Sequence, residues 1–130
     1  MPDTELHQAM ALIQQQCFQA NRDAGWHHDI RTGLLRTPEQ DNDMFAGRIA
    51  LCHSELSEAL EGHRKGLMDD KLKRRRMAEV ELADAVIRIC DLAGIMGYDL
   101  AGALVEKMAF NAQRADHKLE HRLADGGKKY

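Results

Sequence analysis

The chain contains only two prolines, Pro2 and Pro38, and no proline occurs between residues 39 and 130. Because proline breaks helices more strongly than any other residue, most of the sequence is free to form long helices. Aromatic residues are scarce, whereas the helix formers alanine, leucine, glutamate and arginine are common. The sequence shows neither the alternation of a strand nor the signal of a hairpin. These features predict an all-α protein.

Apolar residues recur with helical spacing in four segments. This pattern predicts helices over residues 4–21, 38–65, 70–96 and 100–124, with glycine-containing breaks between them. Pro38 suits the first turn of the second helix, and Asp99 suits the cap of the fourth. We expect an antiparallel four-helix-type bundle. It forms a single domain over residues 1–130, with a frayed tail at about residues 125–130.

Residues 86–96 are apolar on nearly every side of the predicted helix. Val86, Ile87 and Ile89 are β-branched and would also suit a strand, but the length and the flanking periodicity favour a helix. A helix that is apolar all round is buried centrally or in a subunit interface. Since a four-helix monomer of this size would not easily cover it, we expect a homo-oligomer, either a dimer or a dimer of dimers.

Charge and hydropathy exclude several classes of protein. The net charge of −3 argues against a general nucleic-acid binder, which normally carries a basic face. No segment reaches the ~18 consecutive apolar residues of a membrane span, and residues 1–6 lack the features of a signal peptide. We therefore expect a cytoplasmic protein with no nucleic-acid or membrane partner. Cys17, Cys52 and Cys90 suit reduced, buried thiols.

Two similar pentapeptides, residues 55–59 and 81–85, contain the candidate metal ligands. Each has two acids three positions apart, which places both acids on one helix face. If the two helices are antiparallel and joined near residue 67, the pairs lie at similar height. Converging carboxylates repel one another unless a cation neutralises them, and oxygen-only ligands suit Mg²⁺, Mn²⁺ or Ca²⁺. The alternative is two solvated acidic edges. The four acids are Glu55, Glu58, Glu81 and Asp84.

A polar, mostly cationic stripe is predicted on the last helix. Its members, at spacings of four, three and four, are Lys107, Asn111, Arg114 and Lys118. Lysine and arginine neutralise phosphate oxygens, and asparagine supplies an amide for sugar or phosphate. Acids for a metal together with a basic stripe for anions fit phosphoryl chemistry. The alternative is a solvated face with no part in binding.

The ordered set of motifs resembles that of the MazG-like all-α nucleoside triphosphate pyrophosphohydrolases. The set is Glu55-x-x-Glu58, Glu81-x-x-Asp84 and Lys107-x-x-x-Asn111-x-x-Arg114, and it covers roughly residues 45–118. The resemblance implies a helical bundle that dimerises or forms a dimer of dimers, with Mg²⁺ as cofactor and Mn²⁺ as a substitute. It also implies that water attacks the α-phosphorus of an NTP or dNTP, which releases a monophosphate and pyrophosphate. House-cleaning of non-canonical nucleotides is one form of this activity.

The resemblance also assigns roles to individual residues. It implies four metal ligands, of which Glu55 and Glu58 are also the candidate catalytic residues; the other ligands are Glu81 and Asp84. It implies that Lys107, Asn111 and Arg114 contact phosphate and sugar. Trp26 lies near the place where some relatives stack an aromatic residue on the base, and local packing is its alternative role. Several family members have an additional Glu before the first acid, where this chain has Ser54. The residue that activates the water is therefore not fixed by the motif.

Three other classes of protein are alternatives to this resemblance. The doublet His28-Asp29 is similar to that of the HD-type metal phosphohydrolases, which are also all-α. A ferritin-like carboxylate protein requires Glu-x-x-His motifs, and no Glu in this sequence has His three residues later. A non-enzymatic helical oligomer that acts as an interaction module would explain residues 86–96, but it would leave the acids and the basic stripe unused.

Overall fold

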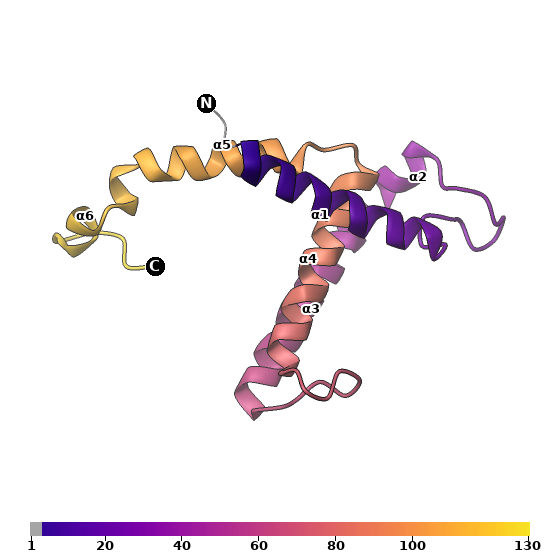
Figure 1. The fold of residues 1–130 in the computed structure, drawn as a ribbon, viewed down its shortest axis with the longest axis horizontal. Helices are drawn as coiled ribbons and strands as arrows, with labels where there is room; N and C mark the ends of the chain where they lie inside the picture. Colours follow the sequence, from indigo (N-terminus) through magenta and orange to yellow (C-terminus); the bar gives the residue numbers. More distant parts are fainter. Residues whose placement is uncertain (1–3) are drawn as a thin grey trace. The chain divides into compact units, whose positions relative to one another are not determined.

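The computed structural model describes residues 4–130, which form six α-helices, one short 3₁₀ helix and no strand (Figure 1). The α-helices are α1 (Thr4–Asp23), α2 (Pro38–Asp43), α3 (Phe45–Lys65), α4 (Met77–Ile95), α5 (Leu100–Gln113) and α6 (Leu119–Leu123), and the 3₁₀ helix η1 is Ala115–His117. The predicted all-α class is confirmed. Within the described range, no helix combines the length and apolar character needed to cross a bilayer.

The described chain divides into two compact units. One unit contains the described residues up to Ala11 together with Asp99–Tyr130, and the other is Leu12–Tyr98. All four candidate metal ligands belong to the Leu12–Tyr98 unit. The predicted basic stripe belongs to the other unit.

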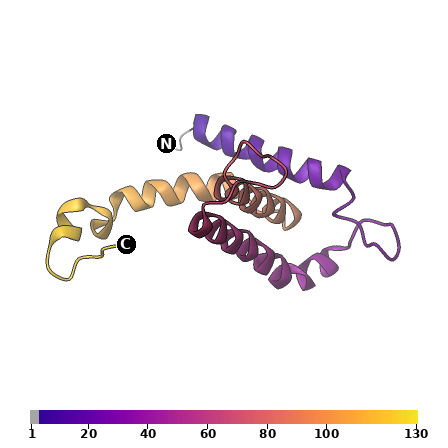
Figure 2. The same cartoon turned by 90° about the horizontal axis from the view of Figure 1, so that it is seen from below.

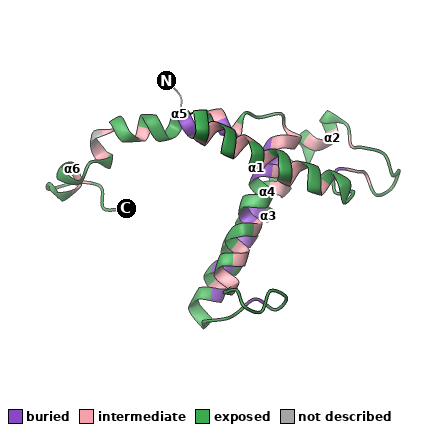
Figure 3. Cartoon of the chain, viewed as in Figure 1, coloured by how far each residue is buried: buried purple, intermediate pink, exposed green. Residues whose placement is uncertain are grey.

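A hairpin of α3 and α4 forms the centre of the Leu12–Tyr98 unit. The two helices lie side by side in both ribbon views (Figures 1 and 2). Small residues allow this close approach: a Cβ added to Gly62 on α3 would lie 2.8 Å from the Met77 Cβ on α4. The turn after α3 begins at Gly66, whose left-handed backbone (φ +63°) ends the helix. Figure 3 shows buried residues on both helices: Cys52, Glu55, Ala59 and Gly62 on α3, and Ala85, Cys90, Leu92 and Ala93 on α4.

Side-chain caps explain where α2 and α5 begin. The Thr37 hydroxyl accepts a bond from the Gln40 backbone N–H (3.2 Å), and the Gln40 side chain accepts one from the Thr37 N–H (2.8 Å). Pro38 fills the first helical position, as predicted. The Asp99 carboxylate accepts a bond from the Gly102 N–H (2.9 Å), so the predicted cap of the helix that starts at residue 100 is also confirmed.

The helix predicted over residues 38–65 is divided at Met44, which ends α2 and precedes α3. Ion pairs across the unit hold the short α2. The Asp41 carboxylate pairs with Arg36 in the preceding loop (3.0 Å) and with Arg48 on α3 (3.2 Å). Asp29 in the same loop accepts a bond from the Gln40 amide (3.1 Å). The prediction of one continuous helix was wrong at Met44, and the contacts of Asp41 with Arg36 and of Gln40 with Asp29 join α2 to the loop before it, which helical periodicity does not encode.

The helix predicted over residues 70–96 begins only at Met77, because a local loop competes with its first turns. The buried Asp69 carboxylate accepts bonds from the backbone N–H groups of Lys71 (3.0 Å) and Leu72 (2.7 Å). The Asp69 N–H donates to the Arg75 carbonyl (2.9 Å). A side chain that satisfies nearby backbone donors in this way offers an alternative to the helix.

The helix predicted over residues 100–124 ends at Gln113, and this corrects the predicted basic stripe. Arg114 has an extended backbone (φ −74°, ψ 131°), and so does Lys118 (φ −91°, ψ 137°). Lys107 and Asn111 therefore share α5, whereas Arg114 and Lys118 lie outside the helices. Arg114 instead pairs with the Asp116 carboxylate through two hydrogen bonds, of 3.0 and 2.7 Å. The four side chains do not form one helical face.

Residues 86–95 are helical, as predicted in preference to a strand, but they are buried on one side only. Cys90, Leu92 and Ala93 are buried, whereas Val86 and Ile89 are exposed to 47% and 43%. The chain itself therefore leaves apolar surface on α4 uncovered.

Candidate metal centre and adjoining pocket

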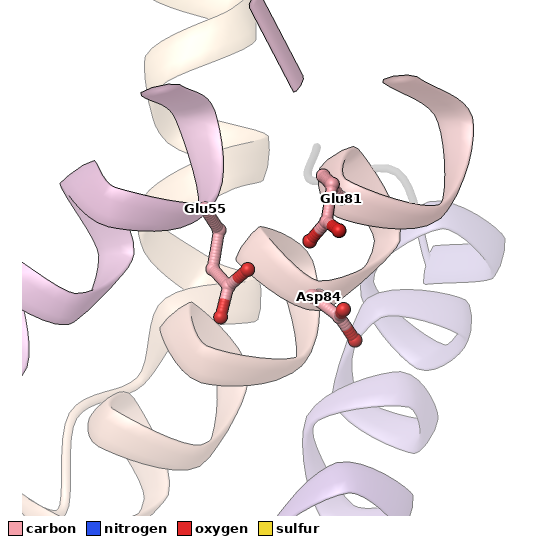
Figure 4. A group of neighbouring side chains, drawn as sticks. All are labelled: Glu55, Glu81 and Asp84. Atoms are coloured by element: carbon pink, nitrogen blue, oxygen red, sulfur yellow. The ribbon is translucent and has the colours of Figure 1, made fainter. Parts of the chain in front are cut away.

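Three carboxylates from α3 and α4 converge in the hairpin. Glu55 extends from α3 and Glu81 from α4 toward one another, with Asp84 one turn farther along α4 (Figure 4). One oxygen from each of the three side chains lies within 4.8 Å of the other two. The sequence predicted that the four acids of the two pentapeptides lie at similar height on neighbouring helices. Three of these four acids come together in the structure. We refer to Glu55, Glu81 and Asp84 as the acidic triad.

Glu58, the fourth predicted acid, is exposed and lies outside this group of three. It is nevertheless near the triad, because its negative charge and its carboxyl group both act on the Glu81 carboxyl. Glu58 is thus placed at the margin of the cluster, with its side chain open to solvent.

The two glutamates of the acidic triad differ in protonation. Burial, with the neighbouring Glu55 and Glu58 adding to it, raises the pKa of Glu81 to about 8. Burial also acts to raise the pKa of Glu55, but Arg88 outweighs this effect and holds that pKa below its ordinary value. The Arg88 Nε donates to Glu55 Oε1 at 2.6 Å. Without a cation, the cluster therefore contains an ionised Glu55 and, at neutral pH, a protonated Glu81.

The donor set of the triad fits a hard divalent cation. All three ligands are carboxylate oxygens, which is the chemistry that Mg²⁺, Mn²⁺ and Ca²⁺ share. Burial and, after it, the acidic neighbours Glu55 and Glu58 raise the pKa of Glu81, and a bound cation would offset the repulsion among these carboxylates. Glu55, Glu81 and Asp84 are the residues that could hold such an ion.

Ser54, at the position where several MazG-like proteins have an additional Glu, and the nearby Glu61 both bond along their own helix. The Ser54 hydroxyl donates to the Leu51 carbonyl of its own helix (2.7 Å). Glu61 pairs with Lys65 one turn later on α3 (2.5 Å). Both side chains are therefore engaged along α3 rather than in the acidic triad.

An open pocket of about 590 Å³ adjoins the triad and includes Glu55 and Asp84 in its lining. One face of α4 forms a wall of this pocket, because the α4 residues that line it follow one another at helical spacings. They are Asp84, Ile87, Arg88, Asp91, Leu92 and Ile95. The remaining lining comes from the end of α1, the loop before α2, and α3: Asn21, Trp26, Arg36, Met44, Arg48, Leu51 and Glu55.

Three arginines line this pocket: Arg36, Arg48 and Arg88. Of these, Arg88 pairs with Glu55 of the acidic triad. Arg36 also donates to the backbone carbonyls of Trp26 (2.8 Å) and His28 (3.1 Å). The local sequence does not identify Arg36 or Arg48 as pocket residues. Arg36 lies in a loop and Arg48 on α3, and both pair with Asp41. The pocket thus combines acids for a cation with guanidinium groups for an anion.

Asp91, which lines the pocket, pairs with a buried histidine, His27, that is not itself a lining residue. His27 Nε2 lies 2.7 Å from Asp91 Oδ1, and the two side chains are exposed to only 4% and 14%. The Arg22 Nε donates to His27 Nδ1 at 3.2 Å, and the Phe18 ring stacks at 4.7 Å from the imidazole. Helical periodicity does not connect Asp91 on α4 with His27, which lies in the segment after α1.

The predicted phosphate contacts Lys107, Asn111 and Arg114 lie in the unit that contains α5. The Lys107 ammonium lies 4.8 Å from the centre of the Phe110 ring, and the Arg114 guanidinium lies 5.8 Å from it. Asn111 Oδ1 is buried without a hydrogen-bond partner among the described residues. Their contact with a substrate remains a prediction.

Trp26 lines the pocket with 71% of its surface exposed, so its ring is accessible to a ligand. The doublet His28-Asp29 belongs to the loop before α2. Asp29 accepts bonds from the Arg31 N–H (2.8 Å) and from Gln40. Within the described part of the chain, this doublet is not part of a cluster of metal-ligating side chains.

Comparison of the chain with protein-family models, with curated proteins and with solved structures gave no match. The resemblance to MazG-like proteins therefore remains a prediction that depends on the motif residues.

Proposed function

We propose that this chain is a Mg²⁺-dependent nucleoside triphosphate pyrophosphohydrolase that converts an NTP or dNTP to a monophosphate and pyrophosphate. The observation that carries the proposal is the acidic triad at the edge of an arginine-lined pocket. A cation site beside guanidinium groups is the combination that phosphoryl transfer requires. A solvated acidic edge would explain neither the raised pKa of Glu81 nor the adjoining pocket.

In this proposal, Glu55, Glu81 and Asp84 hold Mg²⁺, with Mn²⁺ as a substitute, and Glu58 completes the set that the motif suggests. When bound, the ion supplies positive charge that offsets the charge of the phosphate oxygens. Arg88 keeps the Glu55 carboxylate ionised, so that this ligand is ready at neutral pH. Arg48 and Arg88 line the same pocket and donate to phosphate oxygens.

The reaction forms a bond between a water oxygen and the α-phosphorus, and it breaks the bond from that phosphorus to the oxygen bridging it to the β-phosphate. Pyrophosphate leaves with the bridging oxygen. We assign the acceptance of the water proton to Glu58, because it is exposed at the margin of the triad and Ser54 is bonded to its own helix. The proposal includes a cytoplasmic homodimer or dimer of dimers, with house-cleaning of non-canonical nucleotides as one physiological form.

The decisive experiment is a panel of canonical and modified nucleoside triphosphates, assayed for pyrophosphate with Mg²⁺ and with EDTA. We expect Mg²⁺-dependent release of pyrophosphate and a monophosphate in equal amounts. Release of inorganic phosphate with a diphosphate product would contradict attack at the α-phosphorus. Absence of turnover across the panel, with the protein folded and Mg²⁺ present, would favour the non-enzymatic interaction module.

A further inference from the structure

The tautomer of His27 is fixed by its two polar neighbours. Arg22 donates to Nδ1, so this nitrogen carries a lone pair and no proton. The proton of the neutral ring is therefore on Nε2, which donates to Asp91 Oδ1 at 2.7 Å. Phe18 packs against the same imidazole ring and limits its rotation. His27 thus holds the Asp91 carboxylate in one orientation in the pocket wall.

This arrangement leaves one acceptor of Asp91 for a ligand. Among residues 4–130, His27 supplies the hydrogen bond that Asp91 receives, and it uses Oδ1. Asp91 also lines the pocket, so Oδ2 is the acceptor that remains for a donor group inside it. A carboxylate that is largely buried and receives only one bond gains substantially from a second donor.

Asp91 lines the pocket at a distance from the acidic triad. It follows Asp84 by seven residues on the same face of α4, which is two turns or about 10 Å. Apolar side chains of Leu51 and Ile87 line the pocket together with the accessible Trp26 ring. An elongated ligand with phosphates at the triad therefore brings a flat, aromatic group, rather than a hydroxyl close to the phosphates, toward Asp91.

We infer that Asp91, oriented by His27, accepts a hydrogen bond from the exocyclic amino group of a nucleobase. This inference rests on the proposed function and specifies its substrate class. Cytosine, adenine and guanine carry such an amino group, whereas uracil and thymine present carbonyl oxygens. The N3–H of uracil is flanked by two carbonyls, and these would face the carboxylate with like partial charge. The pocket therefore selects amino-bearing bases.

The test is the variant Asp91→Asn, compared for cytidine and uridine nucleotides, which differ at this edge. The His27 Nε2–H donates to the Asn oxygen, so the amide NH₂ takes the place of the free carboxylate oxygen. The parent protein should prefer CTP over UTP in kcat/KM by about tenfold or more. The Asp91→Asn variant should lose this preference or reverse it, because an NH₂ group donates to the uracil carbonyl.

A charge-matched control is Asp70→Asn, an exposed position in the turn before α4, which should keep the parent ratio. An equal loss of activity with CTP and UTP in Asp91→Asn would show that Asp91 supports the fold only, and would overturn the inference. An unchanged ratio of CTP to UTP together with a changed ratio of CTP to dCTP would place Asp91 at the sugar and overturn it as well.

A binding measurement on the parent protein needs neither a variant nor a metal. Trp26 is the single tryptophan and lines the pocket, so its fluorescence reports binding of CMP in EDTA. CMP should bind about tenfold more tightly than the monophosphate of 2-pyrimidinone riboside, which lacks the amino group. Equal affinities would overturn the inference. The expected difference, found in a protein that hydrolyses no triphosphate, would support the base site while the proposed function fails.

Discussion

At the residue scale, every neighbour that affects the Glu81 carboxyl raises its pKa. Burial and the acidic neighbours Glu55 and Glu58 raise its pKa from 4.5 to about 8. The unfolded chain releases this proton near the lower value, whereas the folded chain retains it up to the higher one. Between these values the folded state binds more protons, so the free energy of unfolding contributed by Glu81 falls as the pH rises.

Replacing Glu81 with Gln should remove this part of the pH dependence in metal-free protein. We expect the parent protein to lose on the order of 2 kcal/mol between pH 5 and pH 8 from this group, after allowance for solvent screening at a half-buried site. Urea unfolding in EDTA at both pH values measures it. The informative quantity is the difference between the two proteins in how steeply the free energy of unfolding changes with pH, because the other titrating groups are present in both. Equal slopes would mean that folding does not raise the pKa of Glu81.

Neutralising an acid of the cluster should separate metal binding from folding. Mg²⁺ should raise the melting temperature of the parent protein by relieving repulsion among the carboxylates. In Asp84→Asn and Glu58→Gln, the metal-free protein should be equally or more stable, the Mg²⁺ shift smaller and pyrophosphate release nearly abolished. The loss of the Mg²⁺ shift should be larger for Asp84→Asn, since Glu58 lies at the exposed margin.

Glu61→Gln is the matched control for these amides, because Glu61 lies one turn beyond Glu58 and pairs with Lys65. It should retain the Mg²⁺ shift and the activity. Full activity in both Glu58→Gln and Asp84→Asn would remove the basis of the proposed mechanism.

At the scale of the helices, the α3–α4 hairpin depends on a close approach at Gly62. A Cβ there would lie 2.8 Å from both Cβ and Cγ of Met77, which is closer than packed carbon atoms tolerate. Gly62→Ala should therefore destabilise the protein by about 1–3 kcal/mol. Because the hairpin positions Glu55 against Glu81 and Asp84, the Mg²⁺ shift in melting temperature should fall as well.

Gly47→Ala on the same helix is the matched control. No atom lies within 4 Å of an added Cβ at Gly47, and its backbone does not need a positive φ. Alanine should stabilise α3 there by about 0.5–1 kcal/mol, since it lowers the entropy of the unfolded chain. Chemical denaturation of both variants measures the difference. If Gly62→Ala is as stable as Gly47→Ala, the two helices do not meet closely at Gly62.

Helical periodicity was sufficient to predict that these segments are helices, but not where each helix ends. The break at Met44 follows from the ion pairs of Asp41, and the late start of α4 follows from the bonds of Asp69 to the backbone. Both depend on tertiary or loop contacts that a period of 3.6 residues does not encode. Periodicity also did not predict that α5 ends before Arg114, so the predicted stripe does not form one helical face.

The same distinction applies to the site. The acids were recognisable as candidate metal ligands because the two acids of each pair, three positions apart, lie on one helix face. The hairpin then brings the two pairs to similar height on neighbouring helices. Arg36 and Arg48 were not recognisable as pocket residues, because one comes from a loop and the other from a second helix. Nor was His27 recognisable as the partner of Asp91, because it occupies a buried position after α1. Sequence spacing relates residues on one element, and pockets are made where several elements meet.

For the whole molecule, the largest feature without an explanation in the single chain is its exposed apolar surface. On α3, three exposed residues follow one helical stripe: Ile49, Leu56 and Leu60. On α4, the corresponding stripe is Leu82, Val86 and Ile89. Exposed apolar side chains that share one helix face favour an interface with another chain. The prediction of a homo-oligomer, made from residues 86–96, is therefore extended to α3.

We expect the protein to form a homodimer or a dimer of dimers in which these stripes are buried, because each copy offers the same apolar surfaces to another copy. Multi-angle light scattering at micromolar concentration should give a multiple of the 14.7 kDa chain. A lysine at Leu60 or Val86 would place a charge in the buried interface, so these variants should dissociate and melt at lower temperature. Ile30→Lys is the control, since Ile30 is 97% exposed in a loop outside both stripes and should leave the mass unchanged. A stable 14.7 kDa species in the parent protein would contradict the interface and leave the stripes for another partner.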